Sequence, residues 1–91
     1  MANSKSALKR NRQNKKRRAH NRIFRGRART YVKQARQAIE DQDLESARLY
    51  TEQAVSALDK AAAKGILHKN NASRRKGHIM AQLAALEQAQ N

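Results

Sequence analysis

Residues 43–65 read DLESARLYTEQAVSALDKAAAKG and contain both ends of one amphipathic helix. Asp43 suits the N-cap position, because its carboxylate can accept a hydrogen bond from a free N–H of the first turn. The helix is predicted to end near Lys64, since Gly65 stands at the C′ position and Ile66 can supply the hydrophobic contact of a Schellman motif. Its apolar stripe recurs at helical spacing and consists of Leu44, Ala47, Ala54, Val55, Leu58, Ala61 and Ala62.

The preceding chain predicts a longer first helix, from about Ser6 to Ile39, which ends where Asp41, Gln42 and Asp43 break the pattern. The second half of this helix has an apolar face formed by Phe24, Ala28, Tyr31, Val32, Ala35 and Ile39. A basic stripe has the same spacing and consists of Arg22, Arg25, Arg29, Lys33 and Arg36. At 100° per residue the two stripes lie about a third of a turn apart, so one face can pack while its neighbour meets an anion.

A third helix is predicted to begin near Lys69 or Asn70. Its apolar face consists of Ile79, Met80, Leu83 and Leu86. Three apolar stripes that face one another predict an all-α fold, an antiparallel three-helix bundle whose basic first helix extends beyond the bundle. We expect one domain over residues 1–91, with a bundle at 21–88 and a core that is thin and rich in alanine.

Charge is divided between segments of the chain. The 91 residues contain 21 Lys and Arg against 7 Asp and Glu, a formal net charge of +14. Residues 1–39 hold 14 Lys or Arg and no acid, residues 40–63 hold six acids and two bases, and residues 64–79 hold five bases and no acid. Two cationic segments therefore flank an acidic middle, which suggests a folded body with one face turned away from a polyanionic partner.

Residues 1–20 cannot bury a core, because basic and amide side chains point in every direction from a helix there. We expect this extension to be frayed or disordered alone and helical once a partner neutralises it. Eighteen helical residues span roughly 27 Å, enough to meet phosphates on both sides of a groove. The candidate nucleic-acid-binding residues of the first segment are Lys5, Lys9, Arg10, Arg12, Lys15, Lys16, Arg17, Arg18, Arg22, Arg25, Arg29 and Lys33.

A second basic patch lies at the predicted turn between the second and third helices. The start of the third helix also presents free N–H groups that favour an anion. For Asn70 and Ser73, helix capping and sugar–phosphate contact are equally open readings. The candidate nucleic-acid-binding residues of this patch are Lys64, His68, Lys69, Asn70, Arg74, Arg75 and Lys76.

The sequence offers no recognisable catalytic or metal site, so we expect no enzyme, no cofactor, no metal and no small-molecule substrate. There is no cysteine, and His68 and His78 lack the spacing of a helical zinc pair. The acids from Glu40 to Glu45 are read as helix caps and charge balance. Of the three aromatic residues, Phe24 is read as core, while Tyr31 and Tyr50 favour bundle packing over stacking on bases.

Composition and spacing do not separate RNA from DNA. A DNA-compacting protein, which would bind duplex DNA and RNA alike, is the main alternative. An organelle transit peptide is less favoured, because residues 1–20 lack a continuous amphipathic stripe. A membrane partner is not expected, because the same segment has almost no apolar face to insert and no apolar run is long enough to span a bilayer.

Two motifs resemble the bacterial small-subunit ribosomal protein S-twenty (bS20) family. Residues 1–22, MANSKSALKRNRQNKKRRAHNR, resemble the start of that family, and residues 61–76, AAAKGILHKNNASRRK, resemble its C-terminal signature. The second motif is the more specific, because seven of its positions are in register: Lys64, Gly65, His68, Lys69, Asn70, Ala72 and Arg74. Relatives often have Gly-Asp after the first helix, where this chain has Asp41–Gln42–Asp43, and many carry another base near His78.

The resemblance implies a structural protein of the small ribosomal subunit that binds 16S ribosomal RNA and helps to fold and hold its helices during assembly. It implies that the long basic helix contacts the 5′ domain and the 3′ minor-domain helix, beside other small-subunit components. The absence of a signal peptide suggests cytoplasmic ribosomes, with plastid ribosomes left open. The family's RNA-facing bases correspond to Lys5, Lys9, Arg10, Lys15, Lys16, Arg17, Arg18, Arg22 and the patch from Lys64 to Lys76.

Overall fold

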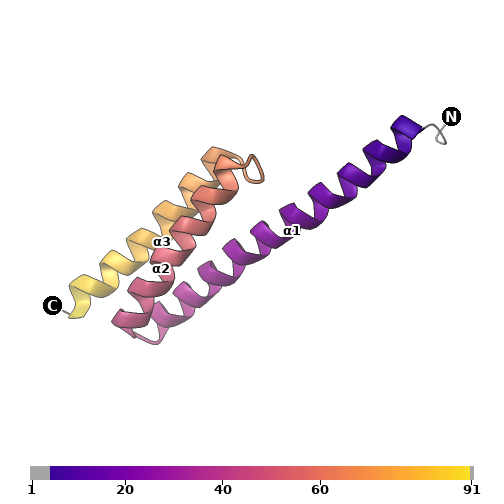
Figure 1. Cartoon of the computed structure of the whole chain (residues 1–91). Helices are drawn as coiled ribbons and strands as arrows, with labels where there is room; N and C mark the ends of the chain where they lie inside the picture. The colour runs from indigo at the N-terminus through magenta and orange to yellow at the C-terminus, as the bar shows by residue number, and fades with distance from the viewer. Residues whose placement is uncertain (1–4, 91) are drawn as a thin grey trace.

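The computed structural model describes residues 5–90 and contains three helices: α1 (Lys5–Glu40), α2 (Leu44–Ala63) and α3 (Lys69–Gln90). Within these residues there is no strand, which confirms the all-α prediction. Figure 1 shows α2 running back beside the second half of α1, and α3 returning along α2. The first half of α1 projects beyond this bundle, so the molecule extends 65 Å in one direction but only 21 and 14 Å in the others.

The turn between α1 and α2 is only three residues long. The Asp43 N–H donates to the Ala38 carbonyl at 3.0 Å and the Gln42 N–H to the Ile39 carbonyl at 3.1 Å, which is the Schellman pattern. Gln42 occupies the C′ position with a φ of 58°. The Asp43 carboxylate then accepts from the Ser46 N–H at 3.2 Å, which confirms its predicted role as the N-cap of α2.

The end of α2 also follows the sequence prediction. Gly65 has a φ of 74°, and its N–H donates to the Ala62 carbonyl at 3.0 Å. The Ile66 N–H donates to the Ala61 carbonyl at 2.9 Å, and the Ile66 side chain is buried. This is a complete Schellman motif with its hydrophobic contact.

The start of α3 depends on a histidine that the sequence did not predict as a cap. His68 Nδ1 accepts from the Asn70 N–H at 3.1 Å, while the His68 carbonyl accepts from the Ala72 N–H at 3.1 Å. His68 thus stands at the N-cap position. The reading of Asn70 as a cap is wrong, because Asn70 already lies inside α3.

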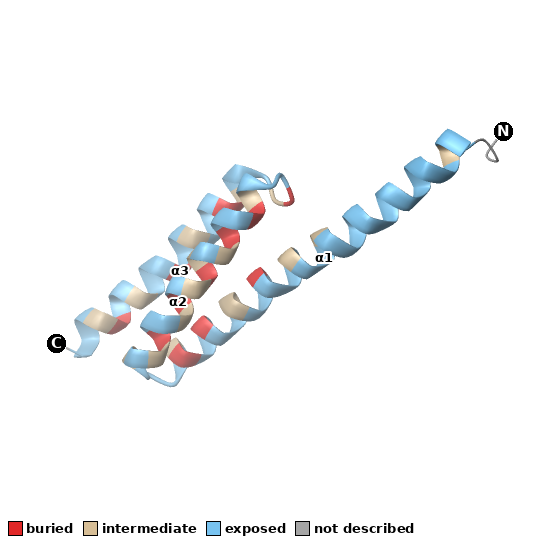
Figure 2. Ribbon diagram, in the orientation of Figure 1, coloured by how far each residue is buried: buried red, intermediate tan, exposed pale blue. Residues whose placement is uncertain are grey.

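All three helices contribute to the core, as Figure 2 shows along their facing sides. One cluster joins Ala28, Leu58 and Ala72, and a second joins Ala38, Ala47 and Leu86. Of the eleven buried hydrophobic residues among those described, seven are alanines, so the helices approach closely but bury few large side chains. The expectation of a thin, alanine-rich core is confirmed.

Two predicted core residues lie elsewhere. Met80 is 53% exposed, because it follows Ile79 directly and is therefore about 100° around the helix from that buried residue. Phe24 is only half-buried, and its ring has the Arg27 guanidinium at 5.8 Å and the Lys64 ammonium at 5.0 Å from its centroid. By contrast, Tyr50 packs against the second cluster, as predicted.

The basic extension is helical from residue 5 to residue 20 in continuity with the rest of α1. Every residue from 8 to 20 is exposed, so this segment adds no buried side chain to the core. Residues 1–4 of the predicted extension lie outside the described part. The prediction that a partner orders residues 1–20 remains a prediction.

Candidate nucleic-acid interface

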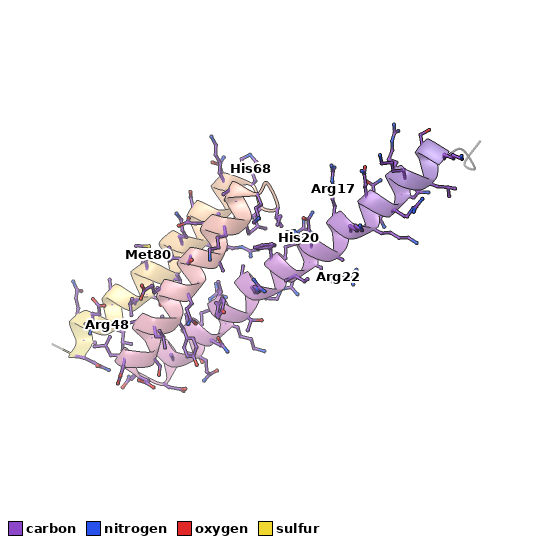
Figure 3. The ribbon with its side chains drawn as sticks, in the orientation of Figure 1. Arg17, His20, Arg22, Arg48, His68 and Met80 are labelled. Carbon is purple, nitrogen blue, oxygen red and sulfur yellow. The ribbon has the colours of Figure 1, made fainter. Side chains whose placement is uncertain are left out.

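The predicted RNA-binding cations of the extension point outward on all sides of α1. In Figure 3, Arg17 and Arg22 project from opposite sides of the ribbon. The two ion pairs found within residues 5–90 are Arg48 with Glu87 and Lys76 with Asp59, and neither involves a cation of α1. The charge of this helix is therefore not neutralised within the described chain, and it is available to an external anion.

The basic stripe of α1 continues this charge along the bundle. Arg22, Arg25, Arg29 and Lys33 are exposed, whereas Ala28 and Ala35 of the same helix are buried. The separation of the packing face from the basic face is confirmed. This arrangement follows from helical periodicity, because the two sets of residues are offset by about a third of a turn.

The structure brings the two basic segments together where α1 leaves the bundle. The Arg25 Nη2 donates to the Ile66 carbonyl at 3.3 Å, and the Lys64 ammonium lies 5.0 Å from the centroid of the Phe24 ring. His20 makes an edge contact with the same ring at 4.9 Å between centroids. The turn between α2 and α3 is thereby held against α1, and the patch from Lys64 to Lys76 adjoins the extension.

Members of the second patch differ in what they already contact. Lys69, Asn70, Arg74 and Arg75 have exposed side chains. His68, which Figure 3 shows at the turn, uses Nδ1 for the cap, so its hydrogen is on Nε2.

Lys76 is the exception in this patch. Its ammonium is 2.7 Å from the Asp59 carboxylate and its side chain is 29% exposed. This ion pair joins α3 to α2. A phosphate that bound Lys76 would therefore have to compete with the Asp59 carboxylate for its ammonium group.

Three exposed acidic residues lie outside the buried stripe of α2. Glu45, Glu52 and Asp59 recur every seven residues and are exposed. Buried Ala47, Ala54 and Ala61 follow each of them by two positions, which is about 200° around the helix. The acids thus lie outside the buried stripe of α2, although the Asp59 carboxylate reaches Lys76 of α3 and Glu52 lines a hollow with Arg27 of α1.

The described residues contain no group of three or more His, Cys, Asp or Glu side chains that could hold a metal ion. Between residues 5 and 90, no helix is long and apolar enough to cross a membrane. One open hollow on α1 is lined mainly by Arg, and a second, between α1 and α3, mainly by Arg and Lys.

One basic residue of this surface was not among the predicted sites. Arg36 lines a hollow together with Arg29 and Lys33 of α1 and Arg75 of α3. Its place in the basic stripe was visible in the sequence. Its convergence with Arg75 was not, because that depends on how α3 packs beside α1.

Comparison with known proteins identifies the family of this chain. The family model described as Ribosomal protein S20 matches residues 2–84. A small ribosomal subunit protein bS20 of Thermomicrobium roseum is 48% identical over 89 residues, covering 98% of this chain and 90% of that protein. The proteins of the same name from Legionella pneumophila (strain Corby) and Saccharophagus degradans are 50% and 49% identical over 86 residues, covering 94% of this chain and 98% of each relative. With nearly the whole chain matched, the protein belongs to the ribosomal protein S20 family.

Proposed function

We propose that this protein is a structural component of the small ribosomal subunit that binds directly to 16S ribosomal RNA through its basic helices. It helps to fold RNA helices and to hold them together during assembly. The observation that carries this proposal is the first half of α1, an exposed cationic helix with no ion pair among the described residues. The relatives' printed names, which place them in the small ribosomal subunit, support the same role.

The mechanism is electrostatic and structural. Lys and Arg that neutralise phosphates release condensed counterions, so affinity grows with the number of phosphates contacted and falls steeply with salt. Arginine adds bidentate phosphate contacts, which lysine cannot make. Because cations surround the extension, it can neutralise several RNA helices at once and reduce their mutual repulsion.

The expected partners follow from this mechanism. They are 16S ribosomal RNA and neighbouring components of the small subunit, with the protein residing in ribosomes of the cytoplasm. The proposed function involves neither a membrane nor a small-molecule substrate. The prediction that the chain is not an enzyme is confirmed, because the family is one of structural ribosomal proteins.

Removal of residues 1–20 tests the proposal directly. The bundle keeps both core clusters, since the first buried residue of α1 among those described is Ala28. We expect the truncated protein to remain folded but to bind 16S ribosomal RNA more than about a hundredfold more weakly at moderate salt. Filter binding measures the affinity, and circular dichroism verifies the fold. A folded variant that retained its affinity would contradict the proposal.

A further inference from the structure

Two hollows lie end to end on one face of α1. The first, of about 530 Å³, is lined by Arg18, Asn21, Arg22, Arg25, Gly26 and Arg29. The second, of about 460 Å³, begins at the same Arg29 and continues between α1 and α3. The two hollows share Arg29, and we call the surface that they form together the basic track. Its α1 cations are Arg18, Arg22, Arg25, Arg29, Lys33 and Arg36.

The charge of the basic track is of one sign along most of its length. Arg75 of α3 adds a seventh cation opposite Arg36, and Glu40 is the first acid, at the far end. The helical rise from Arg18 to Arg36 is roughly 27 Å, which is long enough to follow several consecutive phosphates of one strand. The track crosses the point where α1 enters the bundle, so it joins the extension to the folded part.

Gly26 lines the track near the middle of its length. The residue lies inside α1, is exposed, and has an ordinary helical conformation. A Cβ built there would meet nothing within 4 Å, so neither helix packing nor backbone conformation calls for glycine. Glycine lowers helix stability relative to alanine. Its presence among four arginines allows a ligand to approach the helix backbone more closely than any other residue would.

The other flank of α1 differs in charge and shape. Arg27 projects there and lines a hollow with Lys60 and Glu52 of α2, where cations and an acid are mixed. Arg27 also lies over the Phe24 ring. Arg27 and Arg36 are thus two exposed arginines of one helix on opposite sides of its packing face.

We propose that a single sugar–phosphate strand of folded RNA lies along the basic track, approaches α1 most closely at Gly26, and is contacted from two helices at Arg36 and Arg75. This inference rests on the proposed function and specifies the face that performs it. It assigns RNA contacts to Arg36 and Gly26. It also predicts that Arg27 makes no contact with this RNA strand, although Arg27 is equally basic and exposed.

A matched pair of arginine substitutions tests the track. Arg36→Gln is expected to weaken binding of 16S ribosomal RNA roughly tenfold, as loss of one charge-assisted contact does, and to reduce the salt slope of log K by about 1. Arg27→Gln removes the same charge from the same helix and is expected to change affinity less than about twofold, since exposed charges away from the ligand are screened. Equal effects of the two substitutions would overturn the track.

A matched pair of glycine substitutions tests the close approach. Gly26→Ala and Gly26→Leu are expected to raise the Tm, because both residues favour a helix, and to weaken RNA binding progressively with size. Gly77→Ala in α3 is the control: Gly77 is also exposed in a helix with nothing within 4 Å of an added Cβ, but it lines neither hollow of the track. It is expected to raise the Tm with affinity unchanged. Gly26 variants that are stabilised and bind as tightly as the unsubstituted protein would overturn the close approach.

These outcomes separate the track from the function on which it rests. If the unsubstituted protein binds 16S ribosomal RNA tightly but the Arg36, Arg27 and Gly26 variants all have the same RNA affinity, no RNA strand follows the basic track and the proposed function stands. If the unsubstituted protein fails to bind that RNA, the proposed function itself is wrong.

Discussion

Gln42 lies where α1 ends and has a φ of 58°, in the left-handed region. A side chain with a Cβ is strained there by about 1 kcal/mol or more, whereas glycine is not. The Gln42 carbonyl accepts from the Gln90 side chain at 2.7 Å, and this bond involves only the backbone of residue 42. The hydrogen bonds of the turn use only the backbone of residue 42, so they hold the turn without any contribution from the Gln42 side chain.

Gln42→Gly is expected to stabilise the protein by about 1 kcal/mol, which corresponds to a Tm increase of about 4–8 °C for a domain of this size. Gln34→Gly, at an exposed position inside α1, is the control. It is expected to lower stability by about 1 kcal/mol, because glycine is unfavourable within a helix. Thermal denaturation followed by circular dichroism measures both. A Tm that fell in both variants would contradict the strain at Gln42.

Thr51 carries a hydroxyl that the core does not satisfy. The residue is 3% exposed, and within the described residues its Oγ1 has no hydrogen-bond partner. Thr51→Val keeps the branched shape and removes the polar atom, so it is expected to raise the free energy of unfolding by about 1 kcal/mol. Thr30→Val, at an exposed position, is expected to leave stability nearly unchanged. Urea denaturation distinguishes the two, and a Thr51→Val protein that was less stable would show that the hydroxyl is satisfied.

The two halves of α1 differ in packing, because only the second half has buried residues. Its second half packs Ala28, Ala35 and Ala38 into the bundle. Its first half is exposed from residue 8 to residue 20 and carries like charges that repel one another. Helical segments of this length are marginal without packing, so we expect the first half to have low local stability in the absence of a partner.

Amide hydrogen exchange tests this difference between the halves of α1. Without RNA, amides of residues 5–20 are expected to exchange rapidly, while those of residues 28–40 are protected by the bundle. Bound 16S ribosomal RNA is expected to protect residues 5–20, with little further change at α2. Strong protection of residues 5–20 in the free protein would show that RNA is not needed to order them.

Local sequence signals predicted the helices and most of their ends. Asp43, Gly65 and Ile66 act through neighbours within five residues, so the N-cap and Schellman motif were readable from spacing alone. His68 as a cap was missed, because histidine is not among the usual N-cap residues. Phe24 was predicted to lie in the core, but it is at the end of the bundle where the extension begins. There Arg27 and Lys64 lie over its ring. The groove formed by Arg36 and Arg75 depends on helix packing, which spacing does not encode.

In the whole molecule, the segregated charge and the thin core both favour a protein that is stabilised by a bound polyanion. Basic residues line α1 and the α2–α3 turn, while the exposed acids Glu45, Glu52 and Asp59 lie on α2. Seven of the eleven buried hydrophobic residues described are alanines, so burial alone stabilises the bundle only modestly. An RNA that binds only the folded form adds stability by mass action, and it also relieves the repulsion among the cations of α1.

Competition binding across a salt series tests the central claim most directly. Labelled 16S ribosomal RNA is bound at moderate salt and challenged with excess duplex DNA and with transfer RNA. Binding is expected to survive both competitors and to saturate at one protein per RNA, with a log K that falls linearly with log salt. Displacement by each competitor in proportion to its phosphate would contradict specific binding of 16S ribosomal RNA, because the protein would then recognise charge alone, as a DNA-compacting protein does.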